Sequence, residues 1–264
     1  MERWTGRLLR VATGAVLFFM YVPLALVVIY AFSDKGTSAW PPTSLSTKWI
    51  ELAIANTGLR DAFLTSIVVA LSASIIALLL GSLAALAVAR HRFFGREIVS
   101  LVVIFPIALP GIVTGMALST TFATTGLPLV VLAIVIGHAT FCIVLVYNNV
   151  IARLRRTAAS QEEASADLGA DSWQTFRYIT FPSIRSAILA GALLAFALSF
   201  DEVIVTIFVA GGVKTLPIWI FQSFRLANQV ALVNVAGLVA ILLSVVPVYL
   251  ATRLTRDTGA VGRT

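Results

Sequence analysis

Apolar and polar positions follow one another along this chain in long blocks. Six apolar blocks are each about 20 residues or longer and carry almost no charge; they span residues 11–32, 62–89, 98–122, 129–150, 184–210 and 231–250. An α-helix needs about 20 apolar residues to cross a hydrocarbon core of ~30 Å. The pattern therefore predicts an all-α, polytopic membrane protein with six transmembrane helices.

Composition supports this interpretation. Hydrophobic residues make up 59% of the 264 residues and charged residues only 12%, whereas soluble domains carry roughly 25% charged residues. Most of the surface must therefore face lipid or other apolar helices. The polar segments between the blocks are too short for a separate soluble domain, so residues 1–264 are predicted to form a single transmembrane domain.

Lysine and arginine are distributed unevenly between the two sides of the predicted membrane. Fourteen of the nineteen fall on the side that holds both termini and the loop at 151–183, where basic residues mark the cytoplasm. Both termini are thus expected in the cytoplasm. This distribution also accounts for the net charge of +7 without a nucleic-acid partner.

Prolines and glycines mark the third apolar block as irregular. Pro106 and Pro110 lie within it and predict a kink, because proline removes a helix hydrogen bond. Gly111 and Gly115 form a GxxxG pair, which is typical of a close helix–helix contact.

The loop at 151–183 contains the pattern of two short helices. Ser160 followed by Glu163 is a capping box, which predicts a helix that starts near Gln161. Gly169 is placed to end this helix, as glycine often does. A second capping box then predicts another short helix, and a proline marks the start of the fifth spanning helix. The residues concerned are Asp171, Gln174, Tyr178 as the last helical residue, and Pro182.

Several apolar side chains lie in this polar loop, where water would not favour them; they are Leu168, Trp173, Phe176 and Ile179. They either pack on the protein's own cytoplasmic surface or insert into a partner. The residues alone leave both possibilities open.

The spacing of this loop is similar to the EAA loop of binding-protein-dependent ABC importer permeases, whose pattern is E-A-A-x3-G-x9-I-x-L-P. Glu163, Ala164 and Gly169 match it, while Ser165 and Phe181 depart mildly from it. The resemblance implies the type I importer permease fold and a loop that docks in a groove of an ATPase subunit. The residues that it assigns to this coupling are Glu163, Ala164, Leu168, Gly169, Trp173, Phe176 and Pro182.

Three further stretches resemble the spermidine/putrescine branch of these permeases: residues 90–97, 137–147 and 197–217. The resemblance implies import of a small solute of the polyamine kind across the inner (cytoplasmic) membrane of a bacterial cell. It also implies a homologous second permease in a heterodimer, two ATPase subunits and an extracytoplasmic solute-binding protein.

Enzyme chemistry is not expected in this chain. It contains no G-x-x-x-x-G-K-[ST] phosphate-binding loop, so ATP and Mg²⁺ are expected to be bound by the partner ATPases. His91 and His138 are isolated, which excludes a sequence-local metal cluster. We interpret His138, within a spanning block, as a helix–helix hydrogen-bond partner.

Two acidic residues, Asp201 and Glu202, lie inside the fifth apolar block, where ionisable groups are costly and are candidates for function. On a continuous helix, Glu202 falls on a stripe of small and polar residues suited to a pathway or a tight helix contact: Ala187, Gly191, Ala195, Ser199 and Thr206. Glu202 is therefore predicted to face the pathway and Asp201 a neighbouring helix. The alternative is that both carboxylates are structural.

Other functions remain open from sequence alone. The permease could carry another small solute of the same branch. An ion-coupled secondary transporter or a purely structural membrane subunit would leave the loop at 151–183 unexplained.

Overall fold

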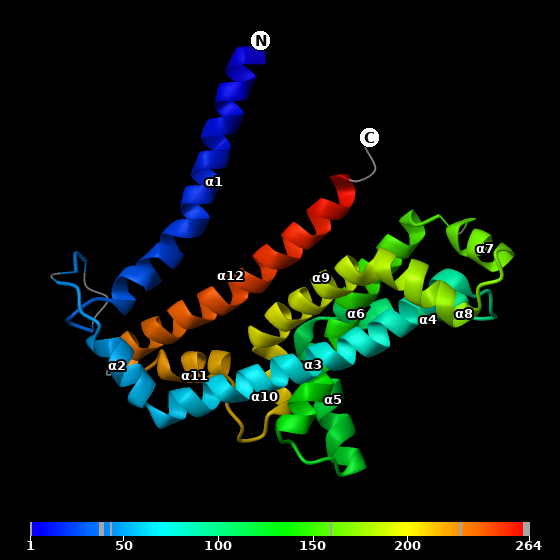
Figure 1. Cartoon of the computed structure of the whole chain (residues 1–264). Coiled ribbons are helices and arrows are strands. Elements are labelled where there is room, and N and C mark those ends of the chain that lie inside the picture. Colours follow the sequence, from blue (N-terminus) through cyan, green and yellow to red (C-terminus); the bar gives the residue numbers. More distant parts are fainter. Residues whose placement is uncertain (1, 37–39, 43, 159, 227–228, 261–264) are drawn as a thin grey trace. The chain divides into compact units, whose positions relative to one another are not determined.

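A computed structural model describes residues 2–36, 40–42, 44–158, 160–226 and 229–260. Arg263, one of the basic residues at the predicted cytoplasmic side, lies outside them. The described elements are helices, and one isolated antiparallel bridge joins Ser33 to Leu45 (Figure 1). The chain divides into two compact units, which comprise residues 1–61 with 219–242 and residues 62–218 with 243–264.

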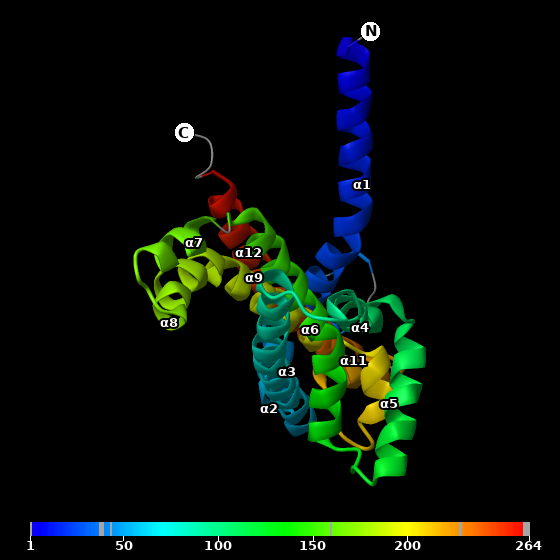
Figure 2. The same cartoon turned by 90° about the vertical axis from the view of Figure 1, so that its right-hand side faces the viewer.

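Five helical segments in the described part are long and apolar enough to cross a membrane: Thr5–Ala31 within α1 (Glu2–Ala31), α3 (Thr57–Arg90), α6 (Val131–Arg156), Ser172–Phe200, and Val230–Arg253 within α12 (Val230–Ala260). A further pair, α4 (Arg96–Ala108) and α5 (Gly111–Thr125), is bent by 107° and forms either a broken span or a re-entrant loop (Figure 2). The all-α fold is thus confirmed, with five apolar spans in the described part of the chain, or six if the bent pair counts as one.

The break between α4 and α5 is much sharper than the predicted kink. Leu109 adopts an extended conformation (φ −83°, ψ 143°) because the ring of Pro110 disfavours helical geometry in the residue before it. Pro110 then caps the start of α5. A helix pair bent in this way exposes backbone groups that a straight span would satisfy, so it requires neighbouring protein.

The first unit contains α1, α2 (Lys48–Ala55) and the first part of α12. A Cβ at Gly237 of α12 would lie 3.1 Å from Val27 of α1, so these two helices approach closely. Trp49 of α2 donates its indole N–H to the carbonyl of Asp34 (3.2 Å). Gly36 has φ +63° and lies under this indole, where any side chain would clash. The short helix α2 lies in the polar segment between the first two apolar blocks.

The second unit is built on α6 and α9 (Phe181–Phe200), which lie side by side in both views (Figures 1 and 2). A Cβ at Gly191 of α9 would lie 3.0 Å from the Cα of Val146 on α6. Near this contact, the Cys142 thiol donates to the carbonyl of Ala195 (3.4 Å). Helix α3 approaches α6 equally closely, because a Cβ at Gly81 would lie 2.8 Å from the Ile143 carbonyl oxygen.

Small residues also join α5 to α10 (Ile204–Val209). Gly111 faces Ile204, and a Cβ at Gly115 would lie 2.6 Å from the ring of Phe208. The predicted GxxxG packing face is confirmed. Such residues allow helices to approach when no hydrophobic effect drives them together in lipid.

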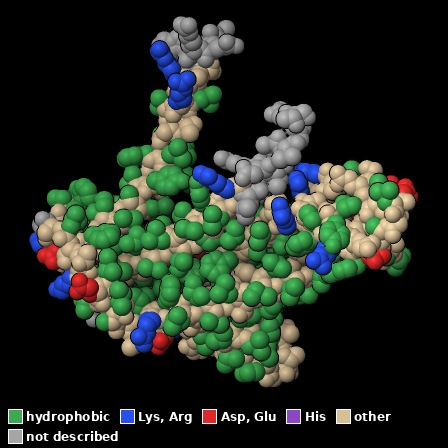
Figure 3. Space-filling model, viewed as in Figure 1, with side chains coloured by type: hydrophobic (Ala, Val, Ile, Leu, Met, Phe, Trp, Pro, Cys, Tyr) green, Lys and Arg blue, Asp and Glu red, His purple; other side chains and the backbone are tan. Residues whose placement is uncertain are grey.

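Hydrophobic side chains cover most of the face shown in Figure 3, and the charged side chains on it are few. Many large apolar residues are at least half exposed, among them Leu83, Leu101 and Val102. A soluble protein rarely exposes apolar patches of this extent, whereas a lipid-facing surface requires them.

The close contact of α6 with α9 yields a prediction about stability. Gly191→Val places two methyl groups against the Val146 backbone and should lower the free energy of unfolding by about 1–3 kcal/mol through overpacking. Thermal unfolding of the detergent-purified chain measures this. Gly212→Ala is the control, because no atom lies within 4 Å of the added Cβ. Equal melting temperatures for both variants would contradict the packing described above.

Candidate functional site

The first helix of the predicted loop is α7 (Ser160–Asp167), which is terminated two residues before Gly169, close to the predicted end. Gly169 has φ +84°, a left-handed conformation that strains any L side chain. Its N–H donates to the Ala166 carbonyl (2.9 Å), and the next N–H, of Ala170, donates to the Ser165 carbonyl (3.1 Å). This six-to-one bond is a Schellman motif, which satisfies the final carbonyls of the helix.

The predicted capping box at Asp171 is present. The Asp171 carboxylate accepts from the Gln174 N–H (2.8 Å), and the Gln174 side chain accepts from the Asp171 N–H (3.0 Å). Both bonds lie at the start of α8 (Ser172–Thr175).

The predicted end of this second helix at Tyr178 is wrong. Helix α8 continues through a π-helical turn, η1 (Phe176–Thr180), directly into α9. In the wider turn, the Phe181 N–H donates to the Phe176 carbonyl, five residues back. Pro182 is the second residue of α9. Because α9 continues directly from η1, the missing N–H of Pro182 lies inside a longer helix, where it would normally interrupt the hydrogen bonding. The helix therefore passes through the π-turn and Pro182 without the break that the sequence predicts.

Exposed and buried sides are distinct in residues 160–182, which we term the α7–η1 segment. Leu168 is 89% and Trp173 65% exposed, and the indole stacks on the half-buried ring of Phe176 at 5.7 Å. Glu163 and Ala164 are exposed as well. Tyr178, which the sequence pattern did not single out for docking, is 69% exposed. The apolar residues therefore do not all pack on the protein's own surface, and their docking role stays a prediction.

Beside these residues lies an open groove of about 570 Å³, lined by Gln161, Ala164, Ser165, Leu168, Ala170, Tyr178 and Ile179. Its walls come from α7 and η1. Ser165 stands where the EAA pattern has alanine; it is buried, and its hydroxyl lies 3.0 Å from the Thr175 hydroxyl. This departure from the family pattern thus joins α7 to α8.

Glu162, which the sequence pattern did not reveal, anchors the α7–η1 segment to the end of α3. Arg90 Nε donates to Glu162 Oε1 (3.0 Å), and Thr180 Oγ1 donates to the same oxygen (2.9 Å). The Arg90 and Glu162 side chains are 19% and 20% exposed. Adjacent helical residues point about 100° apart, so Glu162 faces inward while Glu163 faces solvent. The one available sequence indication was a second glutamate beside Glu163.

A polar cluster joins α6, α9 and α10 around His138, which is fully buried. Its Nδ1 lies 2.8 Å from the Ser199 hydroxyl and its Nε2 2.8 Å from the Thr206 hydroxyl. Thr206 also donates to the Glu202 carbonyl (2.9 Å), so the imidazole is linked through Thr206 to the backbone at Glu202. His138 is therefore a helix–helix hydrogen-bond partner, as interpreted.

The fifth span is not the continuous helix on which the predicted stripe depends. Helix α9 ends at Phe200, and residues 201–203 separate it from α10. The stripe from Ala187 to Ser199 is buried, which is the tight-contact alternative. Because residues 201–203 are not helical, Asp201 and Glu202 do not follow the helical spacing that would place Glu202 on one face with Ser199 and Thr206.

The two carboxylates differ in environment. Asp201 caps the end of α9 and is exposed, rather than held by a neighbouring helix. Glu202 is half-buried, and its Oε1 accepts from the Val205 N–H (3.0 Å) at the start of α10. Of the four predicted pathway residues, Ser199 and Thr206 hydrogen-bond to His138, and Glu202 lines a cavity.

That cavity, of about 160 Å³, lies beside the α4–α5 break; its lining is Pro106, Ile107, Leu109, Gly111, Thr114, Phe141, Leu198, Glu202 and Val205. The Thr114 hydroxyl is buried there without a hydrogen-bond partner in the described part of the chain. Glu202 and Thr114 are thus the polar groups of an otherwise apolar cavity. Within the described residues, no cluster of three or more His, Cys, Asp or Glu is arranged to hold a metal ion.

The class of protein follows from these features together with a family comparison. Residues 77–259 match the family of binding-protein-dependent transport system inner membrane components. The chain belongs to this family, whose members are permease subunits of ABC transporters. The multi-pass helical fold agrees with the family's inner-membrane location.

Among relatives, the putrescine transport system permease protein PotI of Escherichia coli K12 is 36% identical over 217 residues, which cover 79% of this chain and 76% of the relative. The spermidine/putrescine transport system permease protein PotC of the same strain is 32% identical over 255 residues, 96% of each chain. These relatives confirm the resemblance to the polyamine branch.

Solved structures confirm the fold. A bacterial ABC transporter involved in the import of the acidic polysaccharide alginate matches with a TM-score of 0.73 and 17% identity, over 97% of this chain and 96% of that one. The methionine ABC transporter MetNI matches with a TM-score of 0.62 and 16% identity, over 81% of this chain and 99% of that one.

The ion pair between Glu162 and Arg90 yields a prediction, and a substitution at the neighbouring Glu163 provides its control. Glu162→Gln removes a charged hydrogen bond worth about 1.5–3 kcal/mol, so amides of α7 should exchange hydrogen about tenfold faster or more. Hydrogen–deuterium exchange of the purified chain measures this. Glu163→Gln makes the same chemical change one residue along and should leave exchange unaltered. Equal acceleration in both variants would show that Arg90 does not hold the segment.

Proposed function

We propose that this chain is the pore-forming permease subunit of an ATP-driven importer for a small polyamine-like cation. The α7–η1 segment carries the proposal. It is anchored on one side by Glu162, Arg90 and Thr180, and it presents Glu163, Leu168 and Trp173 on the other. An anchored element with exposed aromatic and charged groups is suited to transmit force from a partner.

In this proposal, the partner at the α7–η1 segment is an ATPase subunit. Glu163 pairs with a basic group there, and Leu168, Trp173 and Phe176 fill an apolar groove. Ala164 allows close approach, while Gly169 and Pro182 set the geometry of the two helices. ATP and Mg²⁺ are bound by the two ATPase subunits and not by this chain.

The proposed substrate follows from Glu202 and from the printed names of the relatives. An ionised carboxylate offers about four lone-pair sites, and the Val205 N–H occupies one of those on Glu202. The others can bind an ammonium group of putrescine or spermidine. Thr206 and Ser199 fix the backbone around Glu202 through His138, and the exposed Asp201 lies next to it in the chain.

The proposed assembly pairs this chain with a homologous second permease in a heterodimer, two ATPases and an extracytoplasmic solute-binding protein. Both termini lie in the cytoplasm, since the basic residues gather on that side. The fold alone does not select the substrate, because an alginate importer shares it at 17% identity.

Coupling is tested by uptake of labelled putrescine and spermidine into proteoliposomes that contain the assembled transporter. Glu163→Lys reverses a charge at the proposed interface and should reduce ATP-dependent uptake and ATPase binding by about tenfold or more. Glu97→Lys, the same change at an exposed residue outside the segment, is the control. Uptake that needs no ATP and ignores Glu163 would instead favour a secondary transporter.

Substrate recognition is tested separately with Glu202→Gln. Loss of the carboxylate charge should reduce polyamine uptake by about tenfold, since a hydrogen bond to a charged group is worth about 1.5–3 kcal/mol. ATPase binding should stay normal. Asp201→Asn removes the same charge at the exposed neighbour and should have a smaller effect. Normal uptake by Glu202→Gln would assign both carboxylates a structural role, and ATP-driven uptake of a different solute would overturn only the polyamine assignment.

A further inference from the structure

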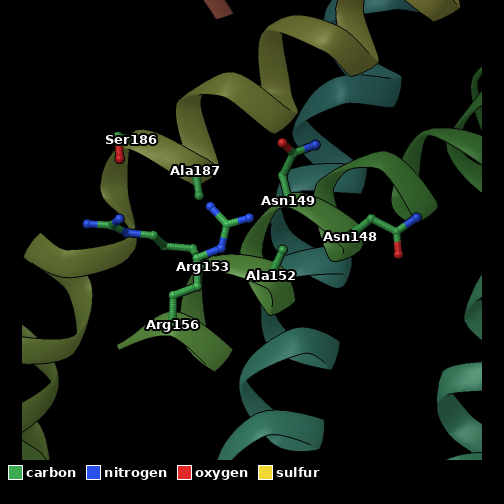
Figure 4. Close-up of a pocket in the computed structure, with 7 residues that line it drawn as sticks. All are labelled: Asn148, Asn149, Ala152, Arg153, Arg156, Ser186 and Ala187. Atoms are coloured by element: carbon green, nitrogen blue, oxygen red, sulfur yellow. The ribbon is translucent and has the colours of Figure 1, made fainter. Parts of the chain in front are cut away.

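A pocket of about 360 Å³ opens between α6 and α9, at the end of α6 that carries its arginines. Its lining is Asn148, Asn149, Ala152, Arg153 and Arg156 of α6 with Ser186 and Ala187 of α9. Figure 4 shows both guanidinium groups reaching from α6 toward α9, while Asn148 points away from them. The pocket is separate from the α7–η1 segment and from the Glu202 cavity.

The polar groups of this pocket suit an anion. Two guanidinium groups supply only donors, and Ser186 adds a hydroxyl. Arg153 is held in place because its Nε donates to the Ser183 carbonyl (2.9 Å). No acidic residue lines the pocket, and the ion pair between Arg90 and Glu162 does not involve Arg156. Two positive charges thus face a pocket whose lining holds no carboxylate.

The pocket lies at the level where a lipid headgroup would be. The apolar block that contains most of α6 ends at residue 150, and Arg153 and Arg156 follow within about two helical turns. On α9, Ser186 and Ala187 lie within the first two turns after Phe181. Basic pockets between transmembrane helices on the cytoplasmic side bind anionic lipid headgroups.

A hydrogen-bond acceptor in the pocket, the side-chain oxygen of Asn149, further narrows the range of anions that the pocket suits. The Asn149 amide nitrogen donates to the Leu145 carbonyl (2.8 Å), which leaves its oxygen for a donor. Hydrogen phosphate carries its hydroxyl on the phosphorus itself, whereas a polyol headgroup carries hydroxyl groups several bonds away from the phosphate, where they can reach an acceptor separate from the arginines. The combination favours a phosphodiester that carries a polyol, such as phosphatidylglycerol.

We propose that Arg153, Arg156 and Ser186 form a binding site for a phosphate-bearing anion, with a phospholipid headgroup of the cytoplasmic leaflet as the source that the pocket fits best. The guanidinium groups bind the phosphate oxygens, and Asn149 accepts from a headgroup hydroxyl. The site does not depend on the transported solute.

Native mass spectrometry of the purified full-length chain tests the site, with short-chain phosphatidylglycerol, short-chain phosphatidylcholine and inorganic phosphate as three separate ligands. Phosphatidylglycerol should bind about fivefold more tightly than phosphatidylcholine, and Arg156→Gln should remove this preference. Arg156→Lys keeps the charge and should retain part of it. Arg155→Gln is the matched control, because Arg155 is an exposed arginine of the same turn that does not line the pocket.

The possible outcomes distinguish a phospholipid headgroup from free phosphate as the ligand of this site. Inorganic phosphate that binds alone and depends on Arg156 would support the anion site but overturn the lipid as its ligand. Equal binding of the two lipids, or equal loss in Arg155→Gln and Arg156→Gln, would overturn the site altogether. Circular dichroism of each variant shows whether the helices have formed. Because lipid binding and not uptake is measured, a negative result leaves the proposed transport function untouched.

Discussion

The close approach of α6 and α9 is the constraint on which the second unit depends. In lipid, apolar surfaces gain little from association, so helices must meet through small residues and internal hydrogen bonds. Gly191 and Ala195 provide the small residues, and His138 with Ser199 provides the hydrogen bond. The α7–η1 segment lies at one end of this helix pair, and the Glu202 cavity lies at the other. A change in the α6–α9 contact therefore affects both.

Local chemistry made much of the fold predictable from sequence. Apolar blocks revealed the spans, and the second capping box at Asp171 and the glycine at position 169 located the helix ends, because each acts through its immediate neighbours. The GxxxG pair was recognisable for the same reason. Of the candidate site, the resemblance to the EAA loop located the α7–η1 segment, but the predicted set included the half-buried Phe176 and missed the exposed Tyr178.

Features that depend on contacts between distant segments were not predictable. Glu162 and Glu163 are equivalent in sequence, and only the position of Arg90, 72 residues earlier, distinguishes them. The break at 201–203 arises where Glu202 caps α10 while Thr206 and His138 bind around it. The continuity of α8 with α9 depends on a π-turn at a proline, where sequence rules favour a helix boundary.

That continuity has a mechanical consequence. Residues from Ser172 to Phe200 form one helical rod, about 43 Å long at 1.5 Å per residue. Every residue of this rod is helical, including those of the π-turn, and the helix is interrupted on either side, at Gly169 and at residues 201–203. In the proposed function, a displacement of Trp173 would therefore be carried along one continuous helix to residues 201–203, which include Glu202. The α8–α9 rod would then act as a lever between the proposed ATPase contact and the Glu202 cavity.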